Sequence, residues 1–303
     1  MDLAEKLANV DMTADNRISG EDRKYGETHQ KAYETALSDL KGLVLYCNSM
    51  NAAQDEILGD YDGAERIYRG YTNIKDFSVD NIEKTIYAIH RRFVIFIVNY
   101  FNRTYNVELE SDEIADSLIP KKPEYDYEND KSYNERCREW KITMDNLSLC
   151  FNDVLDRILI QLDGRTFADR ALDEIIEKSI SNSVIRDTRC FEVKGDTICF
   201  KDYFCNYTDW YSSENWELRE RMKDILPALW HYETGLFYNY GYPISKILYR
   251  FSCPEAEFDG KNKLKSLKCF KNGRVDVKFI SKQNASEFAQ KYLGSVDSGG
   301  IAE

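Results

Sequence analysis

The sequence lacks long apolar runs, and its longest one covers just residues 93–98. It also contains few histidines and prolines, three and five in 303 residues. A membrane-spanning helix needs about 20 apolar residues, so we expect no membrane span. The N-terminal segment MDLAEKLANV is too polar for a secretory signal, which predicts a cytoplasmic protein.

Motifs of the common catalytic classes are also absent. The chain contains no HExxH, Walker A, GxGxxG, GxSxG or DxDxDG pattern. Its eight cysteines include no CxxC pair, and most of them occupy apolar positions of expected helices and strands. We interpret them as reduced core residues and expect no disulfide framework, no metal site and no cofactor.

Charge is distributed unevenly along the chain. The formal net charge of −12 argues against a general affinity for nucleic acid or an anionic membrane. Residues 261–282, in contrast, carry eight basic side chains and one acidic one, so this segment is +7 and the remainder is −19. The segment is a solvated hairpin face, a surface that docks on an acidic partner, or a ribbon that contacts phosphates.

This basic segment has the pattern of a β-hairpin with the turn FKNGR at 270–274. A three-residue loop, with the turn glycine in a left-handed bulge, pairs Cys269 with Val275 on one face. It pairs Lys268 with Asp276 on the other, so one face is apolar and the other polar, as a half-buried hairpin requires. We prefer this register to a two-residue turn, which mixes the faces.

Helical periodicity dominates the first 185 residues, and strand patterns follow it. Segments with the helical period are 28–58, 81–105, 130–163 and 166–181. The 130–163 pattern repeats in heptads, which predicts one long helix in a bundle or, alternatively, a homodimer through this segment. Strand patterns flank turn residues near 189–200 and 265–280, and another helix pattern begins near Ser213.

The predicted fold class is therefore α+β, predominantly helical, with a helical bundle and a small C-terminal antiparallel sheet. We divide the chain into four parts on this basis. They are a polar N-terminal arm (1–26), a helical bundle (27–185), an aromatic-rich α+β region with the basic hairpin (186–294) and a flexible tail (295–303).

Candidate site residues lie in the aromatic-rich region. His231 and Glu233 are weak candidates for an acid/base pair, because residues two apart share no helix face and act together only where the helix has ended. Aromatic rings beside positive charge suit single-stranded or flipped bases, although a core role is the competing interpretation of these rings. The candidate binding residues are Lys268, Lys271, Arg274, Lys278, Tyr238, Tyr240 and Tyr242.

The stretch LKCFKNGRVDVKF at 267–279, followed by a short helix through Phe288 and Leu293, resembles the end of a bacterial and phage domain of unknown function. That domain is often fused to, or encoded beside, adenine DNA methyltransferases on phages, plasmids and other mobile elements. IHRRF (89–93) and LDRI (155–158) are similar to earlier parts of the family, less specifically. The family usually has Asn and His soon after the turn glycine, where this chain has Arg and Asp.

The resemblance implies a non-enzymatic accessory protein of a phage or mobile element that acts in DNA modification, defence or counter-defence. The chain lacks the Gly-rich loop and the Asn/Asp-Pro-Pro-Tyr motif of the methyltransferase itself. The basic hairpin would contact nucleic acid or an acidic protein partner. The alternatives are a cryptic enzyme with a site around His231 and Glu233, and a structural or oligomeric scaffold that uses the 130–163 helix.

Overall fold

The chain forms two compact units, one from residues 1–103 and 109–164 and the other from 104–108 and 165–303. The computed structural model describes residues 18–57, 79–125, 130–186, 188–201, 203–210, 213–237, 254–258 and 262–295. Helices predominate, and antiparallel strands occur in the second unit, so the predicted α+β class is confirmed.

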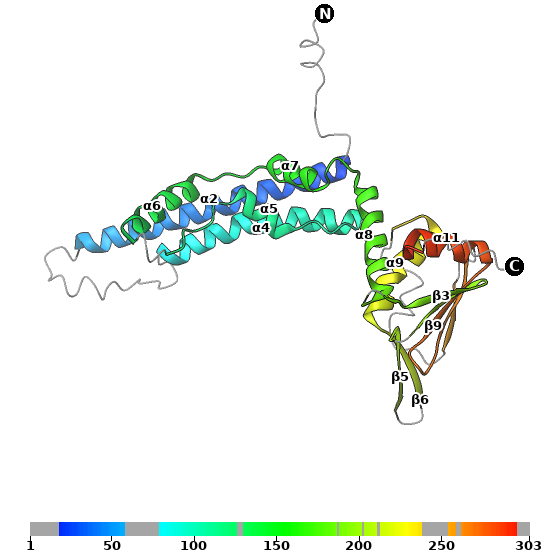
Figure 1. The fold of residues 1–303 in the computed structure, drawn as a ribbon. Coiled ribbons are helices and arrows are strands. Elements are labelled where there is room, and N and C mark those ends of the chain that lie inside the picture. The colour runs from blue at the N-terminus through cyan, green and yellow to red at the C-terminus, as the bar shows by residue number, and fades with distance from the viewer. Residues whose placement is uncertain are drawn as a thin grey trace, which may run out of the picture. The chain divides into compact units, whose positions relative to one another are not determined.

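The described part of the N-terminal unit is built from helices (Figure 1). They are α2 (Gly20–Ile57), α4 (Val79–Tyr105), α5 (Ser111–Leu118), α6 (Asp130–Asn146) and α7 (Phe151–Gln161). Helix α4 supplies much of the core, because its Phe93, Val94, Ile97, Val98 and Phe101 are each at most 3 % exposed. The apolar pattern of this segment therefore marks a helix buried on more than one side.

Helix α2 begins earlier than predicted, within the stretch assigned to the polar arm. The Ser19 N–H donates to Oδ2 of Asp22 (2.6 Å), and the Asp22 N–H donates to Oγ of Ser19 (3.2 Å). This reciprocal capping satisfies N–H groups that a helix start leaves open. Residues 20–26 are consequently helical, and residues 1–17 lie outside the described part of the chain.

The prediction of one long helix over 130–163 is wrong, because the chain is not helical between α6 and α7. Three N–H groups at this break bond to side chains. The Leu149 N–H donates to the Tyr33 hydroxyl (3.1 Å), that of Cys150 to Asp153 (2.8 Å) and that of Phe151 to Gln30 (2.9 Å). The heptad residues Trp140, Met144, Phe151, Val154 and Ile158 are buried inside the unit, so they do not form an exposed seam for a second copy.

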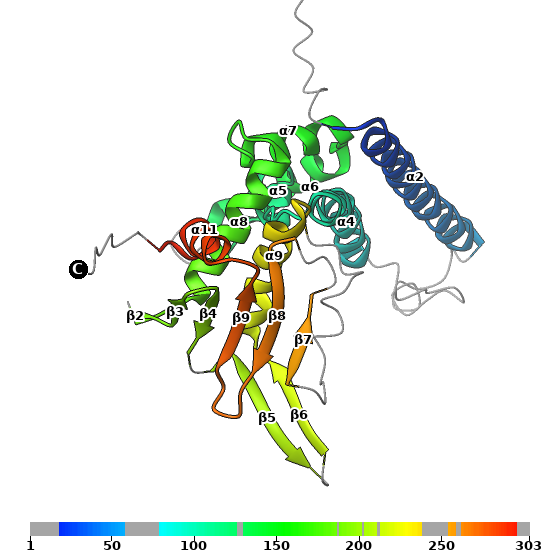
Figure 2. The same cartoon turned by 90° about the vertical axis from the view of Figure 1, so that its right-hand side faces the viewer.

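The C-terminal unit contains a five-stranded antiparallel sheet with helices on one face (Figure 2). The strand order is β3 (Phe191–Lys194), β4 (Thr197–Phe200), β9 (Val275–Phe279), β8 (Leu264–Cys269) and β7 (Glu255–Glu257). Helices α9 (Glu220–Thr234) and α11 (Lys282–Leu293) cover one face, where Ile198, Val277 and Leu267 are fully buried. Both predicted hairpins are confirmed, and they share this sheet because β4 pairs with β9.

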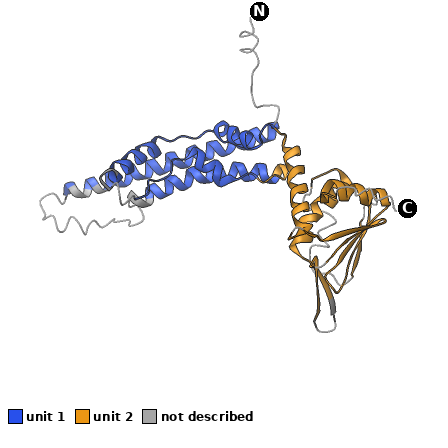
Figure 3. Cartoon of the chain, in the orientation of Figure 1, with its two compact units in different colours: residues 1–103, 109–164 blue, residues 104–108, 165–303 orange. Residues whose placement is uncertain are grey.

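The boundary between the units falls at 164–165 and not at the predicted 185 (Figure 3). Helix α8 (Phe167–Asn182) matches the helix predicted at 166–181 and begins at a capping box of Thr166 and Asp169. Its apolar side chains Leu172, Ile175 and Ile176 pack against the core of the C-terminal unit. Periodicity predicted this helix correctly but not the core that it joins.

The helix predicted from Ser213 is wrong at its start, because residues 213–218 form a strand. Strand β6 (Ser213–Leu218) pairs with β5 (Cys205–Trp210) in a two-stranded hairpin, and a smaller one joins β1 (Val184–Ile185) to β2 (Thr188–Arg189). Trp216 and Leu218 are buried at 3 % and 1 % exposure, with the half-buried Glu217 between them. This alternation has the strand period of two.

Helix α9 follows this hairpin and is continuous through its internal proline. It begins at Glu220, passes Pro227 and reaches Thr234 without a break. Gly235 ends the helix in the left-handed conformation, with φ +73°.

The basic hairpin has the predicted bulged register. Cys269 pairs with Val275 and Lys268 with Asp276, and Gly273 has a left-handed φ of +85°. The Gly273 N–H donates to the carbonyl of Phe270 at 3.0 Å, which closes the turn. The turn residues and the alternation of apolar and polar side chains therefore predict the register of the two strands correctly.

Replacing Gly273 by alanine is expected to lower the free energy of unfolding by about 1–2 kcal/mol, because a left-handed φ is strained for any residue with a Cβ. The added Cβ would also lie 3.1 Å from the Tyr203 nitrogen and 3.3 Å from the Cys205 carbonyl oxygen. Gly195→Ala is the matched control, since Gly195 has φ +62° but open space around its Cβ position. Urea denaturation compares the two variants, and an equal loss in both would show that the close backbone approach has no effect.

Candidate nucleic-acid interface

The open face of the five-stranded sheet is balanced in charge. Three basic side chains of the hairpin pair with carboxylates, two of which come from a neighbouring strand or turn. The ion pairs are Lys268–Glu255 (3.3 Å), Lys278–Asp196 (3.8 Å) and Arg274–Asp276 (3.0 Å). At the sheet edge, Glu192 similarly pairs with Lys194 (3.3 Å) and Lys201 (2.9 Å). Three of the eight basic side chains in the +7 segment of the sequence are therefore paired with carboxylates in the folded unit.

Cations and aromatic rings gather instead around the turn at 270–274. Three segments contribute to this cluster, which we call the turn rim: the turn itself, the residues before and within β5, and the residue before α9. Its members are Tyr203, Tyr207, Arg219, Phe270, Lys271 and Arg274. Each cation lies over a ring, with distances to the ring centroid of 5.1 Å for Arg219–Tyr203, 4.5 Å for Lys271–Tyr207 and 3.9 Å for Arg274–Phe270.

Close backbone contact holds the turn against the chain before β5. The carbonyl of Gly273 accepts the N–H groups of Phe204 (2.9 Å) and Cys205 (3.1 Å). The Cys205 sulfur lies 3.4 Å from the carbonyl oxygens of Phe270 and Arg274, beneath the turn. A hydrogen bond between the two thiols lowers the pKa of Cys205 and raises that of Cys269. The turn rim is thus fixed by buried backbone and thiol contacts.

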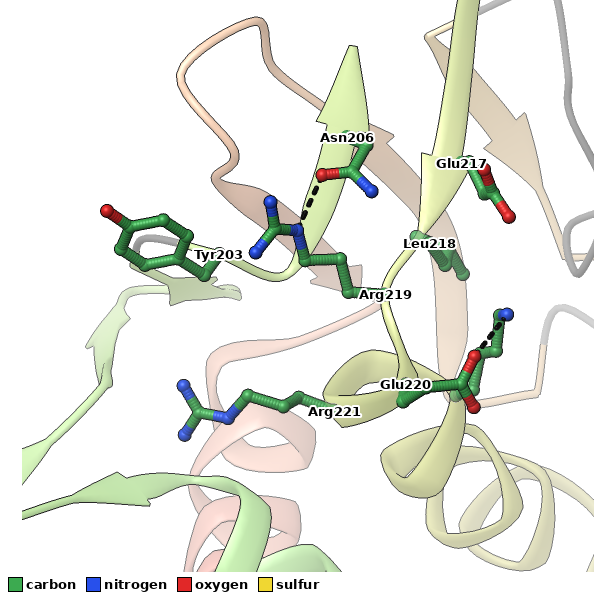
Figure 4. Close-up of a pocket in the computed structure, with 8 residues that line it drawn as sticks. Tyr203, Asn206, Glu217, Leu218, Arg219, Glu220 and Arg221 are labelled. Carbon is green, nitrogen blue, oxygen red and sulfur yellow. Dashed lines mark hydrogen bonds and ion pairs between the residues drawn. The ribbon is translucent and has the colours of Figure 1, made fainter.

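Beside the turn rim lies a pocket of about 370 Å³ between β5, β6 and the start of α9 (Figure 4). Arg219 extends between Asn206 and Tyr203, and its Nε donates to Oδ1 of Asn206 at 2.5 Å. No carboxylate of the described residues forms an ion pair with Arg219. Arg221 has a structural role, since its guanidinium donates to the carbonyls of Asn182 (2.6 Å) and Val184 (3.2 Å).

The structure does not bring His231 and Glu233 together. The Glu233 carboxylate is 7 % exposed and accepts the backbone N–H groups of Asn262 (2.7 Å), Lys263 (2.8 Å) and Leu264 (2.8 Å). Nδ1 of His231 lies 2.7 Å from the Tyr292 hydroxyl, and burial lowers the pKa of this imidazole. The two side chains therefore do not form an acid/base pair.

The sequence predicts two of the six turn-rim residues as binding residues and does not predict the other four. Lys271 and Arg274 were predicted as binding residues, whereas Lys268 and Lys278 lie within the charge-balanced sheet face. The remaining predicted residues, Tyr238, Tyr240 and Tyr242, lie outside the described residues. Tyr203, Tyr207 and Arg219 are not among the predicted residues, because only the β5–β6 hairpin brings them to the turn. The alternation of apolar and polar residues at the end of β6 is the sequence feature that could have predicted this hairpin.

The described residues contain no cluster of three or more side chains that could bind a metal ion. No helix in the described ranges combines the length and apolar character that a membrane span needs. Comparisons of the chain with known protein families, characterised proteins and solved structures found no match.

Proposed function

We propose that this protein is a non-enzymatic accessory protein that contacts single-stranded or locally unpaired nucleic acid through the turn rim. From the resemblance of the C-terminal hairpin, we assign it to DNA modification, defence or counter-defence of a phage or mobile element, acting in the cytoplasm. The observation that carries the proposal is that each cation of the turn rim lies over an aromatic ring.

Rings beside cations match the chemistry of an unpaired nucleotide. Unstacked bases stack on aromatic side chains, and nearby cations neutralise the adjoining phosphates. Tyr203 is 61 % exposed, so a base can pack on its ring while Arg219 beside it contacts a phosphate. A paired duplex hides the faces of its bases, which favours a single strand as the ligand.

The charge-balanced sheet face limits how many phosphates the C-terminal unit can neutralise. Because Arg274 is paired with Asp276, phosphate contacts by Arg219 and Lys271 predict a slope of about −1.4 for the logarithm of affinity against that of salt concentration, the value for two single-strand phosphates. Affinity should therefore be modest and largely independent of base sequence.

Replacing Tyr203 by alanine is expected to weaken binding to a labelled oligo-dT by about 1–3 kcal/mol, the typical contribution of one stacked base. Lys271→Ala should make the salt slope shallower by about 0.7, because one phosphate contact is lost. Lys265→Ala is the matched control, since Lys265 is an exposed lysine in the same hairpin, away from the turn. Fluorescence anisotropy at several salt concentrations measures all three.

Two outcomes would contradict this assignment. One is the absence of oligo-dT binding at low salt, and the other is an equal effect of Lys265→Ala and Lys271→Ala. If poly-glutamate binds the wild-type chain and oligo-dT does not, the turn rim recognises an acidic protein instead. If a duplex of equal length binds as tightly as the single strand, base stacking on Tyr203 is not part of recognition.

The enzyme alternative has less support in the structure. Its two residues have separate partners, because Glu233 holds three backbone N–H groups and His231 contacts Tyr292. The scaffold alternative depended on a continuous 130–163 helix, which is interrupted before Phe151. A binding role at the turn rim is therefore the function that the geometry favours.

A further inference from the structure

A cavity of about 610 Å³ lies in the N-terminal unit, far along the sequence from the turn rim. Four elements contribute to it: helix α4, helix α5, the segment that follows α5, and helix α6. We call it the α4–α6 cavity, and its lining residues are Glu83, Lys84, Tyr87, Asp116, Lys121, Lys122 and Trp140. Its volume is within the roughly 300–1,000 Å³ of small-molecule sites.

The walls of the cavity are held in place by contacts between its elements. Nε1 of Trp140 donates to the carbonyl of Pro120 at 2.9 Å, which joins α6 to the segment after α5. Asp116 on α5 pairs with Lys121 (2.7 Å) and with Arg91 of α4 (2.7 Å). The cavity is therefore largely pre-formed, as ligand sites usually are.

Positive charge remains in the cavity after its acids are neutralised. Glu83 pairs with Lys141, and Asp116 pairs with Arg91 and Lys121. Lys84 and Lys122 also line the cavity, and no carboxylate of the described residues forms an ion pair with either of them. The Lys122 ammonium lies 5.6 Å from the centroid of the Trp140 ring, so cation and indole adjoin in the same wall.

A second cavity of about 300 Å³ adjoins the first and shares Glu83, Lys122 and Trp140 with it. It adds Tyr133 and Arg138 to the lining. The two cavities together offer aromatic surface at Tyr87, Tyr133 and Trp140, and an excess of basic over acidic side chains. A ligand that matches both has a planar ring and more than one negative charge.

We propose that the α4–α6 cavity binds a nucleoside phosphate. The base packs against Tyr87 and Trp140, and the phosphates lie between Lys84 and Lys122, with Arg138 in reach of the adjoining cavity. Lysine acts here as a point charge for phosphate, which needs no bidentate geometry. This site is in the other unit from the turn rim and does not depend on the proposed function.

Isothermal titration of the full chain with ATP, GTP, adenosine and tripolyphosphate tests the proposal. ATP or GTP is expected to bind, and adenosine and tripolyphosphate to bind at least about tenfold more weakly, because each supplies only one of the two contacts. The double variant Lys84→Gln/Lys122→Gln should weaken nucleotide binding about tenfold or more. The control Lys24→Gln/Lys31→Gln, on α2 away from the cavity lining, should leave it unchanged.

Photo-crosslinking with 8-azido-ATP and peptide mapping gives the location, with labelling expected within residues 83–87, 121–122 or 133–141. Three results overturn the proposal: no nucleotide binding at millimolar concentration, tripolyphosphate binding as tightly as ATP, or labelling only in the C-terminal unit. The variant Tyr203→Ala/Lys271→Ala should bind ATP normally, and Lys84→Gln/Lys122→Gln should bind oligo-dT normally. Failure of one site is thereby distinguished from failure of the other.

Discussion

Replacing Glu233 by alanine is expected to lower the free energy of unfolding of the C-terminal unit by at least about 1–3 kcal/mol, because a buried N–H and two part-buried ones lose a charged acceptor. The carboxylate is 7 % exposed and accepts three consecutive N–H groups, those of residues 262–264, at 2.7–2.8 Å. The Leu264 N–H is the buried one, and a buried N–H that loses its acceptor costs roughly 1–3 kcal/mol. The contact ties the end of α9 to the first residue of β8, so its loss affects helix and sheet together.

Glu233→Gln separates charge from shape in this experiment. Glutamine keeps one acceptor oxygen but turns an N–H donor toward N–H groups, so we expect most of the loss to remain. Glu220→Gln is the control, because the Glu220 side chain is 82 % exposed and its substitution should change stability by less than about 0.5 kcal/mol. Urea denaturation followed by tryptophan fluorescence measures all three variants. A loss below about 1 kcal/mol for Glu233→Ala would mean that the N–H groups find water instead.

Acid should destabilise the N-terminal unit through His90. Its side chain is fully buried, and its Nδ1 lies 2.9 Å from the Tyr33 hydroxyl oxygen. Burial, helped by the nearby charge of Lys41 and opposed by the backbone of Met144, lowers the pKa of His90 from 6.5 to about 4. The folded state therefore resists protonation over a range in which the unfolded state takes up a proton.

The direction of the effect follows from this difference in proton uptake. The contribution of neutral His90 to the free energy of unfolding is complete above pH 6.5 and falls as the pH drops toward 4. Below pH 4 the imidazole is protonated in both the folded and the unfolded protein, so the free energy of unfolding falls no further through this group. The difference in pKa corresponds to about 3 kcal/mol in the free energy of unfolding. Urea denaturation followed by circular dichroism at several pH values measures it in the largely helical N-terminal unit.

His90→Gln removes the titrating group, so the free energy of unfolding should fall by about 3 kcal/mol less between pH 6.5 and 4 than in the wild-type chain. His29→Gln is the matched control, because His29 lies half-exposed on α2. An unchanged profile in His90→Gln would show that groups other than His90 cause the acid sensitivity of the unit.

Local chemistry predicted those features whose causes lie within a few residues. The turn glycine predicted the bulged register of the basic hairpin, since only a left-handed residue allows that loop. Thr166 and Asp169 cap the start of α8, Ser281 caps the start of α11, and Gly294 ends α11. Short-range hydrogen bonds of this kind form in the same way whatever the rest of the chain does.

Predictions failed where a distant partner decided the backbone. The heptads of 130–163 contain no helix-breaking residue at the interruption, which depends on hydrogen bonds to Tyr33 and Gln30, more than 100 residues earlier. The strand at 213–218 likewise exists because it pairs with β5. The same holds for the candidate site. Lys271 and Arg274 belong to the basic segment and can be predicted from it, whereas only the fold brings Tyr203 and Arg219 close to them.

The fold class, the two sheet hairpins and the excess of basic residues at 261–282 can be predicted from local sequence patterns. The contacts of those basic residues depend on how the chain folds. Neighbours in the sheet pair with Lys268 and Lys278, and Lys271 at the turn donates to the Tyr207 hydroxyl (3.1 Å) and lies over the same ring. The physical reason is that a local pattern fixes hydrogen bonds over a few residues, while electrostatic partners are set by strand order, which brings together residues far apart in the chain.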